Sequence, residues 1–261
     1  MTNIFQLVDE KQEQFAQLQL SSAQAENLAH TLDIELTYNS NAIEGSTLSY
    51  RETKLILEEG ITIPGKKLRE HLEATNHQSA LEFIQTLKSK KSQELTAAEI
   101  LHIHELILRG IDDENAGRYR QARVGIAHSP VILPNPLKVP ELMTDFWAWL
   151  STPSSDHPLK RACDAHYKLV SIHPFIDGNG RTARLLMNLI LLQAGFPLFA
   201  VRVERRKEYL DTLEQAQINA AEDIVNPSDQ DLAPFYNLIG EELIAGMAFY
   251  LEAERENIFY K

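Results

Sequence analysis

The sequence predicts a mostly α-helical fold, a helical bundle with one small β-hairpin. Apolar residues recur at helical spacing, among good helix formers, through most of the 261 residues. Glycine and proline separate these segments, as is typical of helix ends. No repeat of fixed period is present, which argues against a solenoid.

The first two expected helices run from Phe5 to about His30 and from Leu32 to Ile43, where Gly45 is a natural C′ residue. The remaining expected helices follow in chain order: Tyr50–Glu59, Lys67–Ser89, Ala97–Arg109, Pro140–Ser151, Pro158–Ile172, Gly180–Ala194, Arg205–Ala221 and Asp231–Glu256. Because no long linker separates two halves, we expect one compact unit. Its parts are an N-terminal helical region over residues 1–95, a core over 96–225 and a C-terminal helix within 226–261 that packs on the core.

One segment departs from the helical pattern. "RVGIAHSPVILPNP" (Arg123–Pro136) carries β-branched residues on both sides of a His-Ser-Pro turn, which predicts a short hairpin with proline-rich exits. A hairpin over Val124–Leu133 could bind a target segment by strand addition, or could be purely structural.

Charge and composition exclude several classes of protein. There are 25 basic and 37 acidic residues, a formal net charge of −12, which argues against a general nucleic-acid binder but leaves room for a local basic pocket. The single cysteine, Cys163, excludes an intramolecular disulfide and fits a reducing compartment. No signal peptide is visible at the N-terminus, and the longest apolar run, Leu185–Leu192, is too short to cross a bilayer. We therefore expect a cytoplasmic protein without a membrane partner.

A polar stretch that begins at His173, "HPFIDGNGRTAR", separates two apolar helical segments. Pro174 disfavours helical backbone at His173, so the first helix should end there. Asn179 is a good N-cap for the second helix. Gly178 and Gly180 permit backbone conformations that turn N–H groups toward one point. The pattern predicts a helix, a tight loop and a second helix, with an anion cradle at the start of the second.

Two arginines at the start of that helix strengthen the case for an anion. Arg181 and Arg184 share a face, in a region where the helix macrodipole disfavours cations. A bound phosphate would resolve this, because guanidinium groups bind it through two hydrogen bonds. The alternative is a structural turn with two solvated arginines. "GNGRTA" also fits a dinucleotide pattern, but it follows a helix and not a strand, and no Walker loop is present.

Residues 173–184 match every fixed position of H-x-F-x-[DE]-G-N-G-R-x-x-R, the signature of the Fic family. "GRYR" (Gly117–Arg120) and the hairpin after it resemble the Fic flap, and the resemblance covers roughly residues 100–220. It implies a Fic-type helical bundle. It also implies an enzyme that transfers AMP from ATP to a Ser, Thr or Tyr hydroxyl of a target protein, a reaction called AMPylation.

The resemblance also implies roles for single residues. His173 would be the general base, which suits an imidazole that is neutral near pH 7. Asp177 would bind a Mg²⁺ ion that bridges the phosphates. Arg181 would stabilise charge on the β-phosphate side, and Arg184 would pair with the γ-phosphate. The phosphates would be held by Gly178, Asn179, Gly180, Arg181 and Arg184, and the base would be lined by Tyr209, Glu214 and Gln217. Gln217 stands where the family often has Asn.

Glu44, in "SNAIEG", has a charge that its position in the helix disfavours, as Arg181 and Arg184 do. It lies at a helix C-terminus, where the macrodipole disfavours anions. It could simply be an exposed residue before a glycine cap. The segment resembles the inhibitory motif [ST]-x-x-x-E-[GN] of Fic proteins, with Ser40, Glu44 and Gly45 in the fixed positions. The resemblance implies an inhibitory helix at about residues 31–44, whose Glu44 pairs with Arg184 and blocks productive γ-phosphate binding.

Other functions stay open. Glu44 could orient a water that removes AMP from a modified protein, or the group transferred could be another phosphate-containing one. A nucleotide-binding regulatory module is a third alternative, against which the base His173 argues. His102 and His104 are two positions apart on a helix and are interpreted as incidental, and His166 as a packing or supporting residue. The family makes self-modification and a homodimer further expectations.

Overall fold

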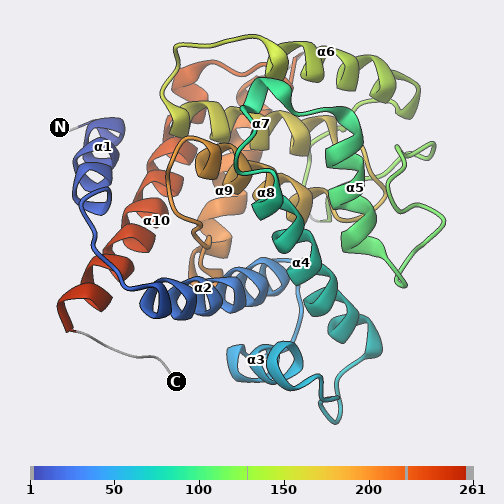
Figure 1. Cartoon of the computed structure of the whole chain (residues 1–261). Coiled ribbons are helices and arrows are strands. Elements are labelled where there is room, and N and C mark those ends of the chain that lie inside the picture. Colours follow the sequence, from blue (N-terminus) through green and yellow to red (C-terminus); the bar gives the residue numbers. More distant parts are fainter. Residues whose placement is uncertain (1–2, 128, 221–222, 257–261) are drawn as a thin grey trace.

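The computed structural model describes residues 3–127, 129–220 and 223–256, and all regular structure in these ranges is helical. The α-helices are α1 (Ile4–Phe15), α2 (Ser22–Ile43), α3 (Tyr50–Glu59), α4 (Leu68–Thr86), α5 (Ala97–Leu108), α6 (Val139–Ser151), α7 (Pro158–Ile172), α8 (Asn179–Gln193), α9 (Arg206–Asn219) and α10 (Asp229–Glu256). Short 3₁₀ helices lie at Ser92–Glu94, Pro136–Lys138 and Val203–Arg205. The mostly α prediction is confirmed (Figure 1).

The N-terminal helices differ from the expectation. The prediction of a single helix from Phe5 to about His30 is wrong, because α1 ends at Phe15 and a second helix, α2, begins at Ser22. Ser21 starts α2 through a capping box: its hydroxyl accepts from the Gln24 backbone N–H at 3.3 Å, and the Gln24 side chain accepts from the Ser21 N–H at 3.0 Å. As a result α2 is 22 residues long.

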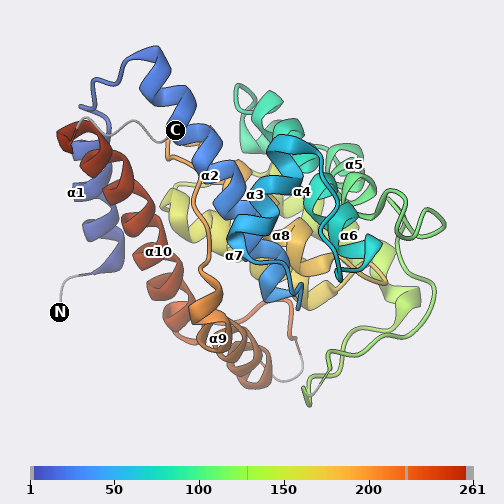
Figure 2. The same ribbon diagram turned by 90° about the horizontal axis from the view of Figure 1, so that it is seen from below.

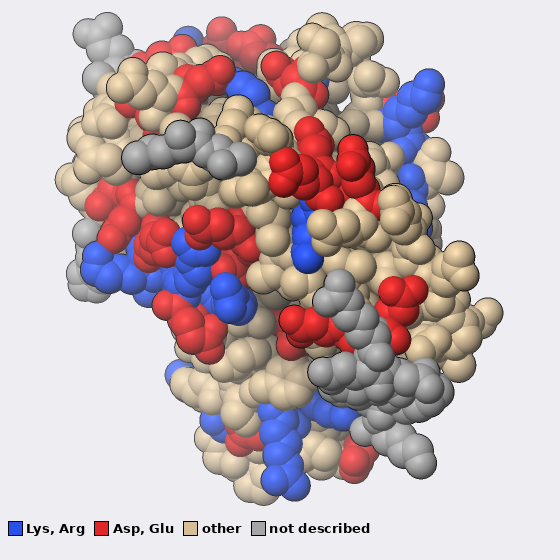
Figure 3. All heavy atoms as spheres, turned by 90° about the vertical axis from the view of Figure 1, so that its left-hand side faces the viewer, with Lys and Arg blue, Asp and Glu red and all other residues tan. Residues whose placement is uncertain are grey.

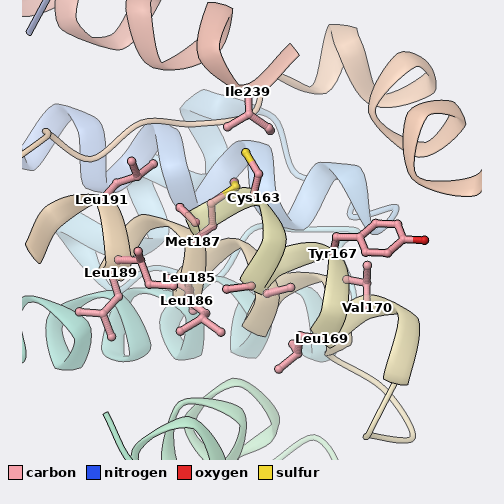
Figure 4. Packing of buried hydrophobic residues seen from close by; sticks show 14 of the residues in the cluster. Cys163, Tyr167, Leu169, Val170, Leu185, Leu186, Met187, Leu189, Leu191 and Ile239 are labelled. Atoms are coloured by element: carbon pink, nitrogen blue, oxygen red, sulfur yellow. The ribbon is translucent and has the colours of Figure 1, made fainter. Parts of the chain in front are cut away.

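Helix α8 is the central rod of the fold. All of its residues are buried except Gly180 and Gln193, as its apolar sequence predicts. Figure 4 shows its side chains packed against α7, with a residue of α10 covering them; those labelled are Cys163, Tyr167, Leu169, Val170, Leu185, Leu186, Met187, Leu189, Leu191 and Ile239. The loop between α7 and α8 is therefore held between two well-packed helices.

The other helices surround this pair. Helix α10 packs on α7 and α9, and α1 packs along α10 at one side of the molecule (Figures 1 and 2). Helices α2, α3 and α4 pack on one another, and the C-terminal half of α2 and helix α4 reach α8. The N-terminal region therefore contacts the central rod directly. The expected boundaries near residues 95 and 225 stay predictions, and the expected segments ending at Ala221 and Lys261 run past the described residues.

The expected β-hairpin is absent from the described part of residues 123–136, which excludes His128. The described residues of this segment are part of the long loop, residues 109–138, that connects α5 and α6 (Figures 1 and 2). Prolines at 130, 134 and 136 supply no N–H group for a ladder. The base of the loop is held instead by Arg120, which donates to the carbonyl oxygens of Ala122 (3.0 Å) and Pro134 (2.7 Å).

The distribution of charged side chains on the surface agrees with the acidic net charge of the sequence. On the face shown in Figure 3, basic side chains form small groups among acidic ones and not one continuous patch. Within the described residues, no helix has the length and apolar character that a membrane span requires.

Candidate active site

Helix α7 ends at Ile172, as predicted, and His173 takes a left-handed backbone conformation with φ 52° and ψ 59°. Such a conformation costs a non-glycine residue roughly 1–3 kcal/mol, so surrounding contacts must hold it. The His173 N–H donates to Leu169 O at 2.9 Å, and the His173 carbonyl accepts from Arg120 Nε at 2.7 Å. The chain reverses here, and the His173 side chain forms part of the wall of a cavity.

The His173 ring has a defined role for each nitrogen. Nδ1 lies 3.2 Å from the Val170 carbonyl oxygen and must donate to it, since a carbonyl only accepts. Nε2 is then the unprotonated nitrogen. Burial lowers the pKa of His173 below its usual value, although the bond to Val170 partly opposes this shift. The imidazole is neutral at pH 7 and can accept a proton at Nε2.

Asn179 has a different structural role from the one expected. The residue before α8 is Gly178, with φ 79° and ψ 3°, so Asn179 is the first helical residue and not the N-cap. Its buried side chain accepts from the Phe175 N–H and donates to the Phe175 carbonyl, both at 2.9 Å. These bonds close the loop on itself. Phe175 is fully buried and anchors the loop in the core.

The carboxylate of Asp177 lies in a ring of four charged side chains. Its Oδ1 accepts from Gly178 N at 2.6 Å and from Arg181 Nη2 at 3.2 Å, and its Oδ2 accepts from Arg69 Nη2. Glu73 closes the ring, at 3.0 Å from Arg69 Nε and 3.3 Å from Arg181 Nη1. Burial raises the pKa of Asp177, but Arg181, Gly178 and Arg69 outweigh it and hold the pKa below its usual value.

Arg181 is 2% exposed, and its Nε has no hydrogen-bond partner among the described residues. A buried guanidinium with an unused donor is expected where an anion binds, because an unsatisfied buried donor otherwise destabilises the protein. Asp177 is a single carboxylate, and the described residues hold no group of three acidic, His or Cys side chains around one point. One carboxylate is compatible with a Mg²⁺ site, because Mg²⁺ commonly takes one or two carboxylates together with phosphate oxygens and water.

Arg184 and Glu44 form an ion pair across the site. Arg184 is 4% exposed, and its Nη2 donates to Glu44 Oε1 and to the Ser40 carbonyl, each at 2.8 Å. Its Nε donates to the Ser40 hydroxyl at 3.0 Å, and its Nη1 to the Tyr209 hydroxyl at 3.3 Å. Every nitrogen of this guanidinium is therefore engaged, mostly by the last turn of α2. Gly45, with φ 100°, then ends that helix as predicted.

Gly180 is where the backbone approaches this pair. A Cβ atom at position 180 would collide with the Glu44 carboxylate and lie 3.0 Å from Arg184 Nη1. The Glu44 carboxylate therefore lies directly over the first turn of α8. That is the space in which an anion held by the helix N-terminus would have to sit.

A cavity of about 410 Å³ opens beside these groups, a size typical of small-molecule sites. The polar end is formed by His173, Gly180, Arg184 and Glu44, and the remaining wall by residues of α7, α9 and the long loop: Val170, Tyr209, Leu210, Leu213, Glu214, Gln217, Ile126 and Ala127, among others. Gln217 is buried and donates to Ser171 Oγ at 3.0 Å. Of the expected site residues, those that line this cavity are Glu44, His173, Gly180, Arg184, Tyr209, Glu214 and Gln217. Ser40 reaches it through Arg184, whereas Asp177 and Arg181 pair with each other outside the lining.

The Tyr209 hydroxyl is fixed from behind by His166, whose Nε2 lies 2.8 Å away. Burial, followed by the nearby charge of Arg184, lowers the pKa of His166 to about 3, so the ring is neutral. His166 is a supporting residue, as expected.

His104 was wrongly interpreted as incidental. Its Nδ1 accepts from the Gly117 N–H at 3.0 Å, and its Nε2 donates to the Asp177 carbonyl at 2.9 Å. The ring stacks on Phe175 at 3.6 Å and is fully buried. Burial lowers its pKa to about 4, which keeps it neutral. A single histidine on an apolar helix face gave no signal for this bridge.

Arg120 is a further residue that sequence reasoning did not single out, although the "GRYR" motif contains it. It joins the loop before α8 to both limbs of the long loop through the carbonyls of His173, Ala122 and Pro134, and its own N–H donates to Pro174 O at 2.8 Å. Arg120 is 3% exposed. It therefore sets the position of the long loop relative to His173.

The sequence of the chain is similar to a known protein family and to several of its members. The Fic/DOC family model matches residues 94–191. Protein adenylyltransferase fic-1 of Caenorhabditis elegans is 38% identical over 250 residues, 94% of this chain and 46% of that protein. Protein adenylyltransferase Fic of Nematostella vectensis is 38% identical over 212 residues, 80% of this chain and 49% of that protein. The chain thus spans about half the length of the curated relatives it matches.

Solved structures superpose on nearly the whole chain. A structure of Fic-1 from C. elegans has a TM-score of 0.85 at 36% identity, and the match covers 98% of this chain and 73% of that one. A Fic domain-containing signaling protein from Bacteroides thetaiotaomicron has a TM-score of 0.87 at 28% identity, with 99% and 100% covered. The chain therefore belongs to the Fic/DOC family.

Proposed function

We propose that the chain is a protein adenylyltransferase that transfers AMP from ATP to a Ser, Thr or Tyr hydroxyl of a target protein, which can be the chain itself. The observation that carries the proposal is that His173 and Arg184 line one cavity of about 410 Å³, with His173 Nδ1 against the Val170 carbonyl, so that Nε2 is left to accept a proton. The similar proteins from C. elegans and N. vectensis are named protein adenylyltransferases, which supports the same activity.

The reaction needs a base and charge stabilisation. His173 Nε2 accepts the proton of the target hydroxyl, whose oxygen forms a bond to the α-phosphorus of ATP while the bond to the pyrophosphate oxygen breaks. The N–H groups at the start of α8, together with Arg181, stabilise the charge that develops on the phosphates. A serine, threonine or tyrosine ester of AMP and free pyrophosphate are the products.

Mg²⁺ would be held by Asp177 and by phosphate oxygens, and it would neutralise phosphate charge and orient the leaving pyrophosphate. The adenine would lie in the part of the cavity between α7, α9 and the long loop. Gln217, oriented by its bond to Ser171, would lie at the base. A target peptide would approach along the long loop, where Ile132 is 87% exposed.

We further propose that Glu44 keeps the enzyme inactive. Arg184 would bind the γ-phosphate, but Glu44 and Ser40 occupy the guanidinium, and the Glu44 carboxylate adds a negative charge beside it. ATP bound against this carboxylate would be displaced from a productive position. Movement of the last turn of α2 would then activate the enzyme.

Mass spectrometry of the intact protein tests this function. We expect Glu44→Gly, incubated with ATP and Mg²⁺, to gain the mass of AMP less water on itself or on proteins of a cell extract. The gain should vanish in Glu44→Gly/His173→Ala and persist in Glu44→Gly/His102→Ala, because His102 is an exposed histidine outside the cavity. If all three variants stay unmodified while AMP is lost from a modified protein, the AMP-removing alternative replaces the proposal.

A further inference from the structure

The four-residue ring around Asp177 leads to an inference about Mg²⁺ that rests on the proposed function. Both carboxylate oxygens of Asp177 already accept hydrogen bonds: Oδ1 from Gly178 N and Arg181, and Oδ2 from Arg69. Oδ1 already has two donors, so the oxygen open to a metal ion is Oδ2, where the metal would meet the positive charge of the Arg69 guanidinium. Since Gly178 N belongs to the loop and Arg181 is 2% exposed, the replaceable donor is Arg69, whose side chain is 53% exposed.

Arg69 is suited to leave and return. Its guanidinium spans two carboxylates, with Nε on Glu73 at 3.0 Å and Nη2 on Asp177. When Nη2 leaves Asp177, the bond to Glu73 on the same helix keeps the side chain close by. No buried group has to move, because Arg69 lies in the first turn of α4 at the surface.

We propose that Arg69 is a positioning residue that occupies Oδ2 of Asp177 in the metal-free protein and competes with Mg²⁺ for that oxygen. Arg69 holds the carboxylate in place until the metal arrives, and it sets the Mg²⁺ concentration at which the nucleotide site becomes competent. This control is separate from that of Glu44, which pairs with a different arginine, Arg184. Arg69 also precedes residues 94–191, the part matched by the family model.

The test measures binding and not turnover. The probe is an ATP analogue with a methylene group between the α- and β-phosphates, which cannot transfer AMP. Its affinity is measured by calorimetry in EDTA and over a series of Mg²⁺ concentrations, with every protein carrying Glu44→Gly. The variants are Arg69→Gln and, as a matched control, Lys67→Gln. Lys67 is an exposed cation two positions earlier that bonds Glu70 through its backbone N–H.

We expect Arg69→Gln to lower the half-saturating Mg²⁺ concentration by about two- to fivefold, the range for an exposed ion pair. The affinity in EDTA should not change, and Lys67→Gln should behave as the unsubstituted protein does. An unchanged Mg²⁺ dependence would overturn the inference. So would an equal shift in Lys67→Gln, which would mean a long-range charge effect, or weaker binding in EDTA, which would make Arg69 a phosphate ligand. Absence of binding to every variant would instead overturn the proposed function, and this inference with it.

Discussion

Replacing Glu44 by Gln isolates the charge of the ion pair with Arg184, because the amide keeps the size and one acceptor oxygen of the carboxylate. A hydrogen bond to a charged partner contributes about 1.5–3 kcal/mol and a neutral one about 0.5–1.5 kcal/mol. The Glu44 side chain is 40% exposed, so solvent screens part of the difference. We therefore expect Glu44→Gln to lower the free energy of unfolding by about 1 kcal/mol, or roughly 2–4 °C in melting temperature.

The same change should strengthen ATP binding. If Glu44 and the γ-phosphate compete for Arg184, weakening the Glu44–Arg184 pair by about 1 kcal/mol should increase the affinity for ATP roughly fivefold. ADP lacks the γ-phosphate, so its affinity should change by less than about twofold. Melting curves without ligand and calorimetric titrations with ATP and ADP measure these quantities. A Glu44→Gln protein that melts with the wild type, or that gains equally for ATP and ADP, would refute the competition for Arg184.

Three further outcomes are expected. Because burial lowers the pKa of His173 below its usual value, the initial rate of AMP transfer by Glu44→Gly should be half-maximal below about pH 6.5 and level above pH 7; a midpoint above 7 would contradict the neutral base. Burial lowers the pKa of His77 and of His166 to about 3, so the unfolded chain takes up protons below about pH 6.5 that the folded chain does not. The free energy of unfolding should then fall by about 1 kcal/mol per histidine between pH 7 and 5.5. In denaturant titrations of His77→Gln, this pH-dependent loss of stability should be smaller by about 1 kcal/mol than in the wild type. Lysine cannot replace the three side-chain hydrogen bonds of Arg120, so Arg120→Lys should lower the free energy of unfolding by about 2–4 kcal/mol. The control Arg123→Lys, on the exposed loop, should change the free energy of unfolding by less than about 0.5 kcal/mol. Equal effects of the two substitutions would exclude the bridging role of Arg120.

The sequence was sufficient for the parts of the site that local chemistry determines. Pro174 predicted the helix end at Ile172, and the apolar run after Arg184 predicted the buried α8. The ion pair between Glu44 and Arg184 followed from a resemblance, since residues 140 positions apart carry no local signal for pairing.

Other features depend on long-range contacts that no local pattern specifies. Asn179 is a good N-cap in isolation, but its side chain instead closes the loop on Phe175. The long loop has strand-forming residues, but its prolines lack the N–H groups that a β-ladder needs. The loop is held instead by hydrogen bonds from Arg120 to its carbonyl oxygens. His104 bridges two loops that meet only in the folded chain, so sequence reasoning could not assign it.

The most direct test of AMP transfer by His173 determines which phosphate of ATP becomes bound to protein. Wild type, Glu44→Gly and Glu44→Gly/His173→Ala are each incubated with Mg²⁺ and with ATP labelled on either the α- or the γ-phosphate, and the proteins are separated on a gel. We expect protein-bound label from α-labelled ATP only, strong in Glu44→Gly, weak in the wild type and absent from the double variant. Label from γ-labelled ATP, or equal labelling with and without His173, would contradict this expectation.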